Sequence, residues 1–212
     1  MKRALTVDNI LMKKRNYIPW GNPKFQEAFG KPEACGVWFI WANSGNGKSS
    51  LVMELIKAMS PVGRVVMNAL EEADSDSMRK KLVEHRMSDL KKKLLFVNES
   101  MEELELRLDR KKSAKIVVID SVQYTHMSYK EYVRFKEKYA TTKILIFTSH
   151  ADGKKPTGRV ANSIMYDAYM KVWVEGYRAF CKGREIGENG GIYTIWNEGA
   201  ERYWGEELTT KN

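Results

Sequence analysis

A short apolar segment, a glycine-rich loop and an amphipathic helix follow one another between Gly36 and Leu55, and this order constrains the fold more than any other feature. The apolar run at residues 37–41 is typical of a buried parallel strand. Apolar residues then repeat at helical spacing from Leu51 to Met59. The segment therefore predicts a strand, a tight loop and a helix, with a phosphate-binding loop at the junction.

The loop matches the phosphate-binding pattern G-x-x-x-x-G-K-[ST], except that Ala42 takes the place of the first glycine. Gly45 and Gly47 lack a Cβ where backbone amides must turn toward a phosphate, and the start of the helix adds its positive end. We expect Lys48 to meet the β- and γ-phosphates of ATP and Ser49 to hold Mg²⁺ through its hydroxyl. The alternative is a glycine-rich turn that binds nothing. The residues expected to contact the nucleotide are Asn43, Ser44, Gly45, Asn46, Gly47, Lys48, Ser49 and Ser50.

A second buried strand ends in a carboxylate, Asp120. Residues 116–119 are four apolar residues in a row, which is the pattern of a central strand that delivers an acidic side chain beside a phosphate-binding loop. Together with the Ser49 hydroxyl, Asp120 is expected to hold the Mg²⁺ shell. Many buried strands end in aspartate for structural reasons, so the prediction depends on the neighbouring loop.

Apolar strands alternate with amphipathic helices after residue 35, which predicts an α/β fold with a mostly parallel central sheet flanked by helices. The predicted strands are residues 37–41, 64–68, 94–97, 116–119 and 144–148, and the predicted helices are residues 48–59, 75–90, 101–110 and 128–139. Short aromatic and β-branched runs after residue 165 predict antiparallel strands appended at the C-terminal edge. Residues 1–34 show no periodicity, so we expect an N-terminal arm or cap before a core at residues 35–212.

The composition is that of a globular domain with a basic surface. With 43% hydrophobic and 30% charged residues, the 212-residue chain can form one substantial core. The net charge of +9 favours a polyanionic partner, although lysines at helix ends are often only solvated caps. The basic residues gather at Lys13-Lys14-Arg15, at residues 91–93, at residues 110–112 and at Lys154-Lys155.

The sequence predicts a cytoplasmic protein without membrane contact. Its apolar runs are far shorter than the roughly 18 residues that a membrane helix needs, and residues 1–17 lack the continuous apolar segment of a signal peptide. Cys35 and Cys181 are far apart and have no metal-ligand spacing, so reduced, structural thiols are expected.

The segment from Gly36 to Trp196 resembles the core of the RecA-fold ATPases, both in the strand sequence VVIDSVQ at residues 117–123 and in the order of the motifs. The similarity is greatest to the RadA branch, and the hexameric DnaB-type helicases are more distant. The resemblance implies a RecA-like P-loop NTPase core that hydrolyses ATP with Mg²⁺ and assembles into a homo-oligomeric ring or filament with shared ATP sites. It also implies binding of nucleic acid, single-stranded DNA above all, in recombination, repair or replication. The resemblance covers a bare core, so it does not imply strand exchange or unwinding.

The resemblance also assigns residues that surround the γ-phosphate. Glu71 takes the place of the base that polarises the attacking water, with Glu72 in reserve, because a carboxylate can accept a proton while it orients water. His150 takes the place of a sensor that hydrogen-bonds the γ-phosphate. The alternatives are a solvated loop for the two glutamates and a structural role for the histidine.

A mobile DNA-binding loop is implied at residues 152–163, where Lys154, Lys155 and Arg159 suit a flexible segment that grips a nucleic-acid backbone. The first loop of the same kind would carry Tyr124, His126 and Tyr129, which either stack on bases or pack against the protein.

The K-x-R segment at Lys182 and Arg184 resembles residues that reach the ATP site of the neighbouring subunit in these oligomers. Their cations can neutralise charge on the transferring phosphoryl group. The alternative is a basic β-turn.

Three functions are compatible with these motifs. The first is a RecA-type ATPase coupled to single-stranded DNA. The second is a module in which ATP stabilises assembly or partner docking and hydrolysis is negligible. The third, a small-molecule P-loop kinase, would need an arginine-rich acceptor lid, and nothing between the motifs resembles one.

Overall fold

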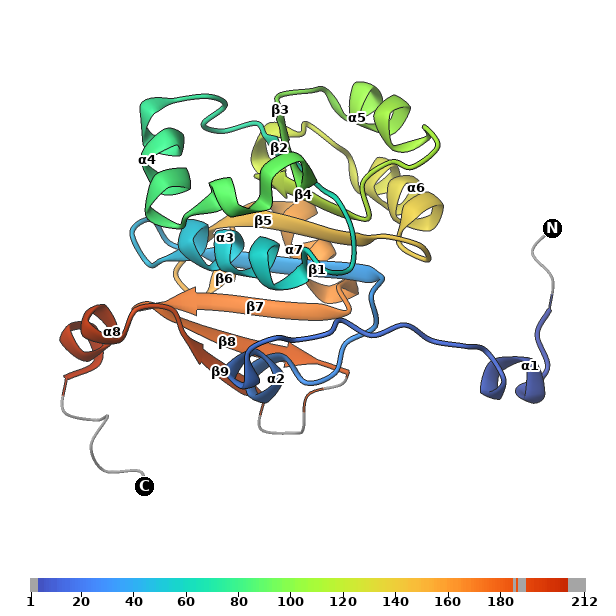
Figure 1. Ribbon diagram of the computed structural model, residues 1–212, viewed down its shortest axis with the longest axis horizontal. Coiled ribbons are helices and arrows are strands. Elements are labelled where there is room, and N and C mark those ends of the chain that lie inside the picture. Colours follow the sequence, from blue (N-terminus) through green and yellow to red (C-terminus); the bar gives the residue numbers. More distant parts are fainter. Residues whose placement is uncertain (1–3, 185, 187–189, 206–212) are drawn as a thin grey trace.

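A twisted central sheet runs through the molecule, with helices on both faces (Figure 1). The computed structural model describes residues 4–184, 186 and 190–205. The strand order is β3-β2-β4-β5-β1-β7-β8-β9, and β6 pairs with β5 outside this path. The strands are β1 (Gly36–Ala42), β2 (Val65–Ala69), β3 (Leu94–Val97), β4 (Ile116–Asp120), β5 (Ile144–Asp152), β6 (Lys155–Pro156), β7 (Met170–Glu175), β8 (Arg178–Gly183) and β9 (Gly191–Thr194).

The helices divide between the two faces of the sheet because side chains alternate along each strand. On β1, Trp38 and Ile40 join a core with α2, α3 and α4, while Phe39 and Trp41 join a second core with α5, α6 and α7. Both cores are buried, which explains why β1 is apolar throughout. The helices are α1 (Val7–Leu11), α2 (Pro23–Phe29), α3 (Lys48–Met59), α4 (Asp76–Glu84), α5 (Met101–Leu108), α6 (Tyr129–Tyr139), α7 (Arg159–Asp167) and α8 (Asn197–Trp204), with the 3₁₀ helices η1 (Met87–Lys93) and η2 (Val122–Tyr124).

The structure confirms the predicted α/β architecture and the mostly parallel sheet. The six strands from β3 to β7 in the sheet order pair in parallel, and β8 and β9 are added through antiparallel pairings. One detail of the prediction is wrong: β7, the first of the appended strands, runs parallel to β1. A parallel β7 ends beside the predicted phosphate-binding loop, and this places the β7–β8 turn next to that loop.

A single helix predicted at residues 75–90 is wrong. The structure has α4, which ends at Glu84, followed by the separate 3₁₀ helix η1. Arg86 lies between them with φ of 49°, a left-handed conformation that a continuous helix excludes. The break allows the Met87 and Leu90 side chains to be buried in the core beneath α3. Their burial offsets the energetic cost of the left-handed backbone at Arg86.

The N-terminal segment has two parts with different surroundings. Ile18, Phe25 and Phe29 are buried and belong to the same core as Trp38, and Phe25 stacks on Tyr193 of β9 with ring centroids 4.6 Å apart. Helix α1 has no buried residue and extends away from the body of the molecule (Figure 1). Within the described residues, no helix combines the length and the apolar character that crossing a membrane requires.

Candidate functional site

The residues predicted to surround ATP meet at the carboxyl ends of the central strands. A cavity of about 360 Å³ lies there, bounded by the loop after β1, the segment after β2, the end of β4 and the end of β5. Its lining residues are Ala42, Asn43, Ser44, Gly45, Gly47, Lys48, Ser49, Ser50, Glu71, Glu72, Lys81, Asp120, His150 and Tyr177. The structure thus brings together all the predicted nucleotide and catalytic residues except Asn46, Lys182 and Arg184.

The backbone of the loop explains which glycines of the pattern this chain needs. Gly45 has φ of 79° and Gly47 has φ of 96°, and both values lie in the left-handed region that favours glycine. Ala42 is the last residue of β1 and is not among the described residues with positive φ, so its Cβ is tolerated there. Helix α3 begins at Lys48, directly after the loop, and its unpaired N–H groups therefore face the cavity.

Asn46 holds the loop in shape from behind rather than lining the cavity. Its side-chain amide donates to the carbonyls of Asn43 and Ser44, both at 3.2 Å. Its side-chain oxygen accepts a hydrogen bond from the Gly176 amide at 2.7 Å, and its carbonyl accepts one from Tyr177 at 3.2 Å. The loop is therefore fastened to the turn between β7 and β8.

Asp120 lies at the floor of the cavity, almost fully buried. The Lys48 Nζ is 3.5 Å from its Oδ1, and the Thr148 hydroxyl donates a hydrogen bond to the same oxygen. No group of three or more acidic, His or Cys side chains among the described residues could hold a metal alone. One carboxylate beside the Ser49 hydroxyl fits Mg²⁺, which usually keeps several waters and takes further ligands from substrate phosphates. Ser49 and Asp120 are the residues that would hold the ion.

The two glutamates after β2 have different partners. The Glu71 Oε2 lies 3.4 Å from the His150 Nε2. Glu72 instead accepts two hydrogen bonds from the Lys81 Nζ, at 2.6 and 2.8 Å. Glu72 is thus paired with a cation on α4, whereas Glu71 faces the end of β5.

The end of β5 connects this cavity to the following segment. The Gln123 side chain donates to the Ser149 hydroxyl at 2.8 Å and to the Thr157 carbonyl at 2.9 Å. The Tyr124 ring meets the His150 ring edge to face, with centroids 6.3 Å apart. His150 therefore lies between the cavity and residues of both predicted nucleic-acid loops.

The flexible segment predicted at residues 152–163 is instead ordered by pairing. Strand β6 pairs with the end of β5, and α7 begins at Arg159. The Trp41 indole N–H donates to the Lys154 carbonyl at 3.0 Å, and the Asn43 amide donates to the Gly153 carbonyl at 3.0 Å. These bonds compensate for the conformational entropy lost in ordering the segment. Lys154, Lys155 and Arg159 are exposed on it.

Lys182 and Arg184 lie away from the P-loop of their own chain. Gly183, between them, pairs with Met170, which in turn pairs with Trp38. Trp38 precedes Ala42 by four residues, or about 13 Å along a strand. The two cations are exposed toward the amino ends of the parallel strands, whereas the cavity lies at their carboxyl ends.

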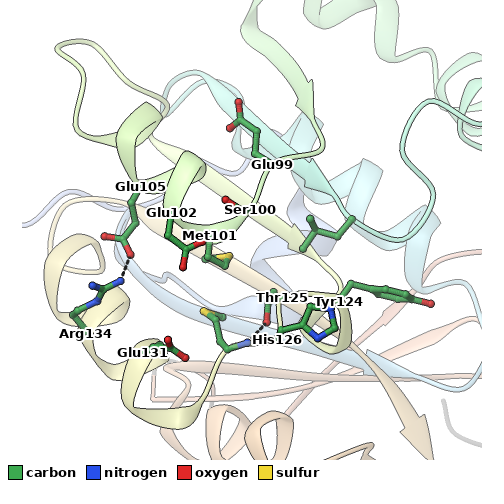
Figure 2. Close-up of a pocket in the computed structure, with 12 residues that line it drawn as sticks. Glu99, Ser100, Met101, Glu102, Glu105, Tyr124, Thr125, His126, Glu131 and Arg134 are labelled. Atoms are coloured by element: carbon green, nitrogen blue, oxygen red, sulfur yellow. Dashed lines mark hydrogen bonds and ion pairs between the residues drawn. The ribbon is translucent and has the colours of Figure 1, made fainter.

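Tyr124 and His126 border a second cavity of about 380 Å³, between the η2 segment and helix α5 (Figure 2). Its other walls include four glutamates, and the carboxylate of one of them, Glu105, pairs with Arg134 at 2.6 Å. Tyr129 stacks on Tyr132 with ring centroids 5.9 Å apart, so it packs at least in part against α6 itself.

Sequence comparison with protein-family models gives no match, and comparison with curated proteins gives none either. Among solved structures, a KaiC-like protein from the hyperthermophilic archaeon Pyrococcus horikoshii OT3 is similar, with a TM-score of 0.60 and 15% sequence identity. The alignment covers 84% of this chain and 92% of that chain. The chain has a KaiC/RecA-like α/β fold, with a mostly parallel sheet and antiparallel C-terminal strands. At this identity the likeness establishes the fold alone.

Three residues of the cavity region had no sequence signal of their own. Lys81 is one of two adjacent lysines in a mostly exposed helix, and only the packing of α4 turns it toward Glu72. Tyr177 enters because β7 runs parallel to β1, which the sequence did not indicate. Thr148 was within a predicted strand, and its bond to Asp120 depends on the adjacency of β4 and β5.

Proposed function

We propose that this protein is a Mg²⁺-dependent ATPase of RecA type, most similar to the RadA branch, which oligomerises and couples ATP turnover to single-stranded DNA. The observation that carries the proposal is the convergence of Lys48, Ser49, Asp120, Glu71 and His150 on one cavity beside a glycine loop with two left-handed residues. Each has the chemistry that transfer of a phosphoryl group to water requires.

Some of these residues would bind the phosphates, and others would activate the attacking water. The loop amides and the start of α3 bind the phosphates, and the Lys48 cation, now near Asp120, is available to the β- and γ-phosphates. Ser49 and Asp120 would hold Mg²⁺, whose charge would offset the negative charge that develops on the phosphates. Glu71 orients the attacking water and takes its proton, while His150 beside it reports the presence of the γ-phosphate.

The position of Lys182 and Arg184 supports assembly with shared sites. Because they lie at the opposite end of the sheet from their own P-loop, any contact with ATP must be made in a neighbouring subunit. A contact of this kind repeats head to tail, which generates a ring or a filament.

The β5–β6 hairpin and the start of α7 support binding of a polyanion. Their cations are exposed, and the hairpin is hydrogen-bonded to both the P-loop residue Asn43 and the adjacent Trp41. If nucleotide binding changes the conformation of the P-loop, these hydrogen bonds transmit the change to the hairpin residues that would contact the nucleic-acid backbone.

ATP turnover with and without single-stranded DNA tests the proposal. We expect the wild-type protein to hydrolyse ATP, to do so faster with DNA, and to lose hydrolysis in Lys48→Ala, which removes a side chain that faces the cavity rather than the core. Replacing Lys154, Lys155 and Arg159 together should lower the slope of log K against log salt by about 2, since each phosphate contact contributes about 0.7. Nucleotide binding without turnover would leave an ATP-stabilised docking module, and normal turnover in Lys48→Ala would eliminate the site.

A further inference from the structure

The outer face of the β7–β8–β9 extension carries side chains that the two cores use only in part, since Trp173 packs partly against the core that contains Phe39 and Trp41. The register places Lys171 opposite Lys182, Trp173 opposite Phe180, and Phe180 opposite Ile192. Through β1, this row continues the face that carries Phe39 and Trp41, which α7 covers. Within the part of the chain that the structure describes, Phe180 and Ile192 belong to neither core, and Ile192 is 59% exposed.

Two rings of this face, Trp173 and Phe180, and two rings of α8, Trp204 and Tyr203, form a continuous row. The Trp173 and Phe180 ring centroids are 5.2 Å apart, those of Phe180 and Trp204 are 5.8 Å apart, and those of Trp204 and Tyr203 are 5.2 Å apart. The first three rings are partly exposed, and Tyr203 is 53% exposed. Trp173 packs in part against the second core, but each of the four rings keeps some exposed surface, and that surface is available to an aromatic ligand. We call these four residues the ring row.

Cations lie over two rings of the ring row. The Lys154 Nζ lies 5.4 Å from the Trp173 ring centroid, and the Arg178 guanidinium lies 5.4 Å from that of Trp204. Lys171 and Lys182 lie one row further along the same face of the strands. The one carboxylate on the strand rows, Glu175, accepts a hydrogen bond from Tyr203 at 3.4 Å. The strand rows carry three cations, Lys171, Arg178 and Lys182, against one carboxylate, and this excess of positive charge favours an anionic partner.

We propose that the ring row is a stacking platform for single-stranded nucleic acid and extends the basic hairpin into one continuous binding surface. Bases would stack on the rings while the flanking lysines and arginine contact the phosphates, a combination that single-strand binding requires. Lys154 belongs to both parts, because its side chain lies over Trp173 and its carbonyl is bonded to Trp41. The inference rests on the proposed function and locates its DNA surface.

The test compares oligo-dT binding of Phe180→Leu and Phe180→Tyr by fluorescence anisotropy, with a labelled oligomer of about 20 nucleotides. Leucine keeps apolar volume but removes the ring, so we expect affinity to fall about fivefold or more, as for the loss of one stacked base. Tyrosine keeps the ring and should retain binding. Tyr17→Leu is the matched control, since Tyr17 is also partly exposed and has the Lys31 Nζ 4.9 Å above its ring, but lies on the N-terminal segment.

The dependence of oligo-dT affinity on salt concentration distinguishes the loss of a stacked ring from the loss of a phosphate contact. Phe180→Leu should leave the salt slope unchanged, whereas Lys171→Ala should reduce it by about 0.7. Unchanged affinity in Phe180→Leu, with wild-type binding intact, would overturn the platform and leave the proposed function standing. A wild-type protein that binds no oligo-dT would overturn both. Loss of assembly in Phe180→Leu without loss of oligo-dT affinity would make this face a contact between copies, and would also overturn the platform.

Discussion

Glu71 and Glu72 are neighbours in sequence, yet their surroundings give them different chemistry. Glu72 accepts two short hydrogen bonds from the Lys81 Nζ, one on each carboxylate oxygen, so both oxygens are already engaged by that cation. Among the described residues, the Glu71 carboxylate pairs with His150 at a longer 3.4 Å, and the Glu71 backbone N–H donates to the Asp120 carbonyl. On this geometry we keep Glu71 as the proposed base and Glu72 as the alternative.

We expect Glu71→Gln to bind ATP with nearly unchanged affinity and to stop turnover, because glutamine keeps the shape but cannot accept a proton. Glu72→Gln should keep most of the turnover, since its partner Lys81 is retained. ATP hydrolysis and nucleotide affinity, measured on both variants, check this pair. An inactive Glu72→Gln beside an active Glu71→Gln would move the base by one residue.

At the residue scale, the sequence predicted side chains whose place follows from spacing along the chain. The strand before the loop and the helix after it determine where the glycines, the lysine and the serine of the loop lie. Asp120 is placed by the end of its strand. Lys81 could not be predicted, because its pairing with Glu72 follows from the angle at which α4 packs. The roles of all these residues in hydrolysis stay predictions.

Helix α3 and strand β9 meet through a partly buried carboxylate. The Tyr193 hydroxyl donates to the Glu54 Oε2 at 2.7 Å. The pKa of Glu54 is raised above its ordinary value, because burial disfavours the charged carboxylate. The hydrogen bond from Tyr193 and the nearby His85 and Lys57 act in the opposite direction but do not cancel the effect of burial. The protonated form is favoured in the folded state, so the free energy of unfolding is greatest below the ordinary pKa and falls as pH rises through the raised pKa.

Glu54→Gln should therefore raise the melting temperature near pH 7 and change it much less near pH 4, because glutamine can still accept the bond from Tyr193 without carrying a charge. Thermal unfolding at both pH values measures the difference. Glu84→Gln, which changes an exposed glutamate at the end of α4, is the control and should be almost neutral at either pH. A stabilisation by Glu54→Gln that is equal at both pH values would contradict the role of burial.

At the scale of elements, periodicity predicted the parallel strands and the helices between them well. It failed where tertiary contacts override local pattern. The helix at residues 75–90 breaks at Arg86 so that Met87 and Leu90 can be buried, and the segment after His150 folds into a hairpin because Trp41 and Asn43 bond to it. Those partners are more than a hundred residues away in the sequence, beyond the range of any local signal.

The topology of the whole molecule separates each P-loop from the K-x-R segment of the same chain. This separation makes a prediction about mixtures of two inactive proteins. Arg184→Ala should lower turnover by about 10³-fold if it acts as arginine fingers do, and Lys48→Ala should be inactive for want of a phosphate contact. When the two are mixed, one kind of interface has an intact loop and an intact finger, so activity should partly return.

The measurement is ATP hydrolysis across mixing ratios under conditions where subunits exchange. Each variant assayed alone at the same total protein concentration is the control. Mixed assembly is confirmed separately, by pull-down of one tagged variant with the other. If mixed assemblies form and no activity returns at equal proportions, each subunit completes its own site and the shared-site arrangement is wrong.

The bonds from Asn46 to the β7–β8 turn have a thermodynamic consequence for ligand binding. Fixing one backbone residue costs about 1–2 kcal/mol of conformational entropy, and a loop that is already fastened has met that cost during folding. Preorganisation of this kind raises affinity without any new contact to the ligand. Asn46→Ala should therefore weaken ATP binding although Asn46 does not line the cavity, and calorimetry should show the loss as a less favourable binding entropy. Asn46 would then influence affinity through the unbound protein, by narrowing the set of shapes that the empty loop can adopt.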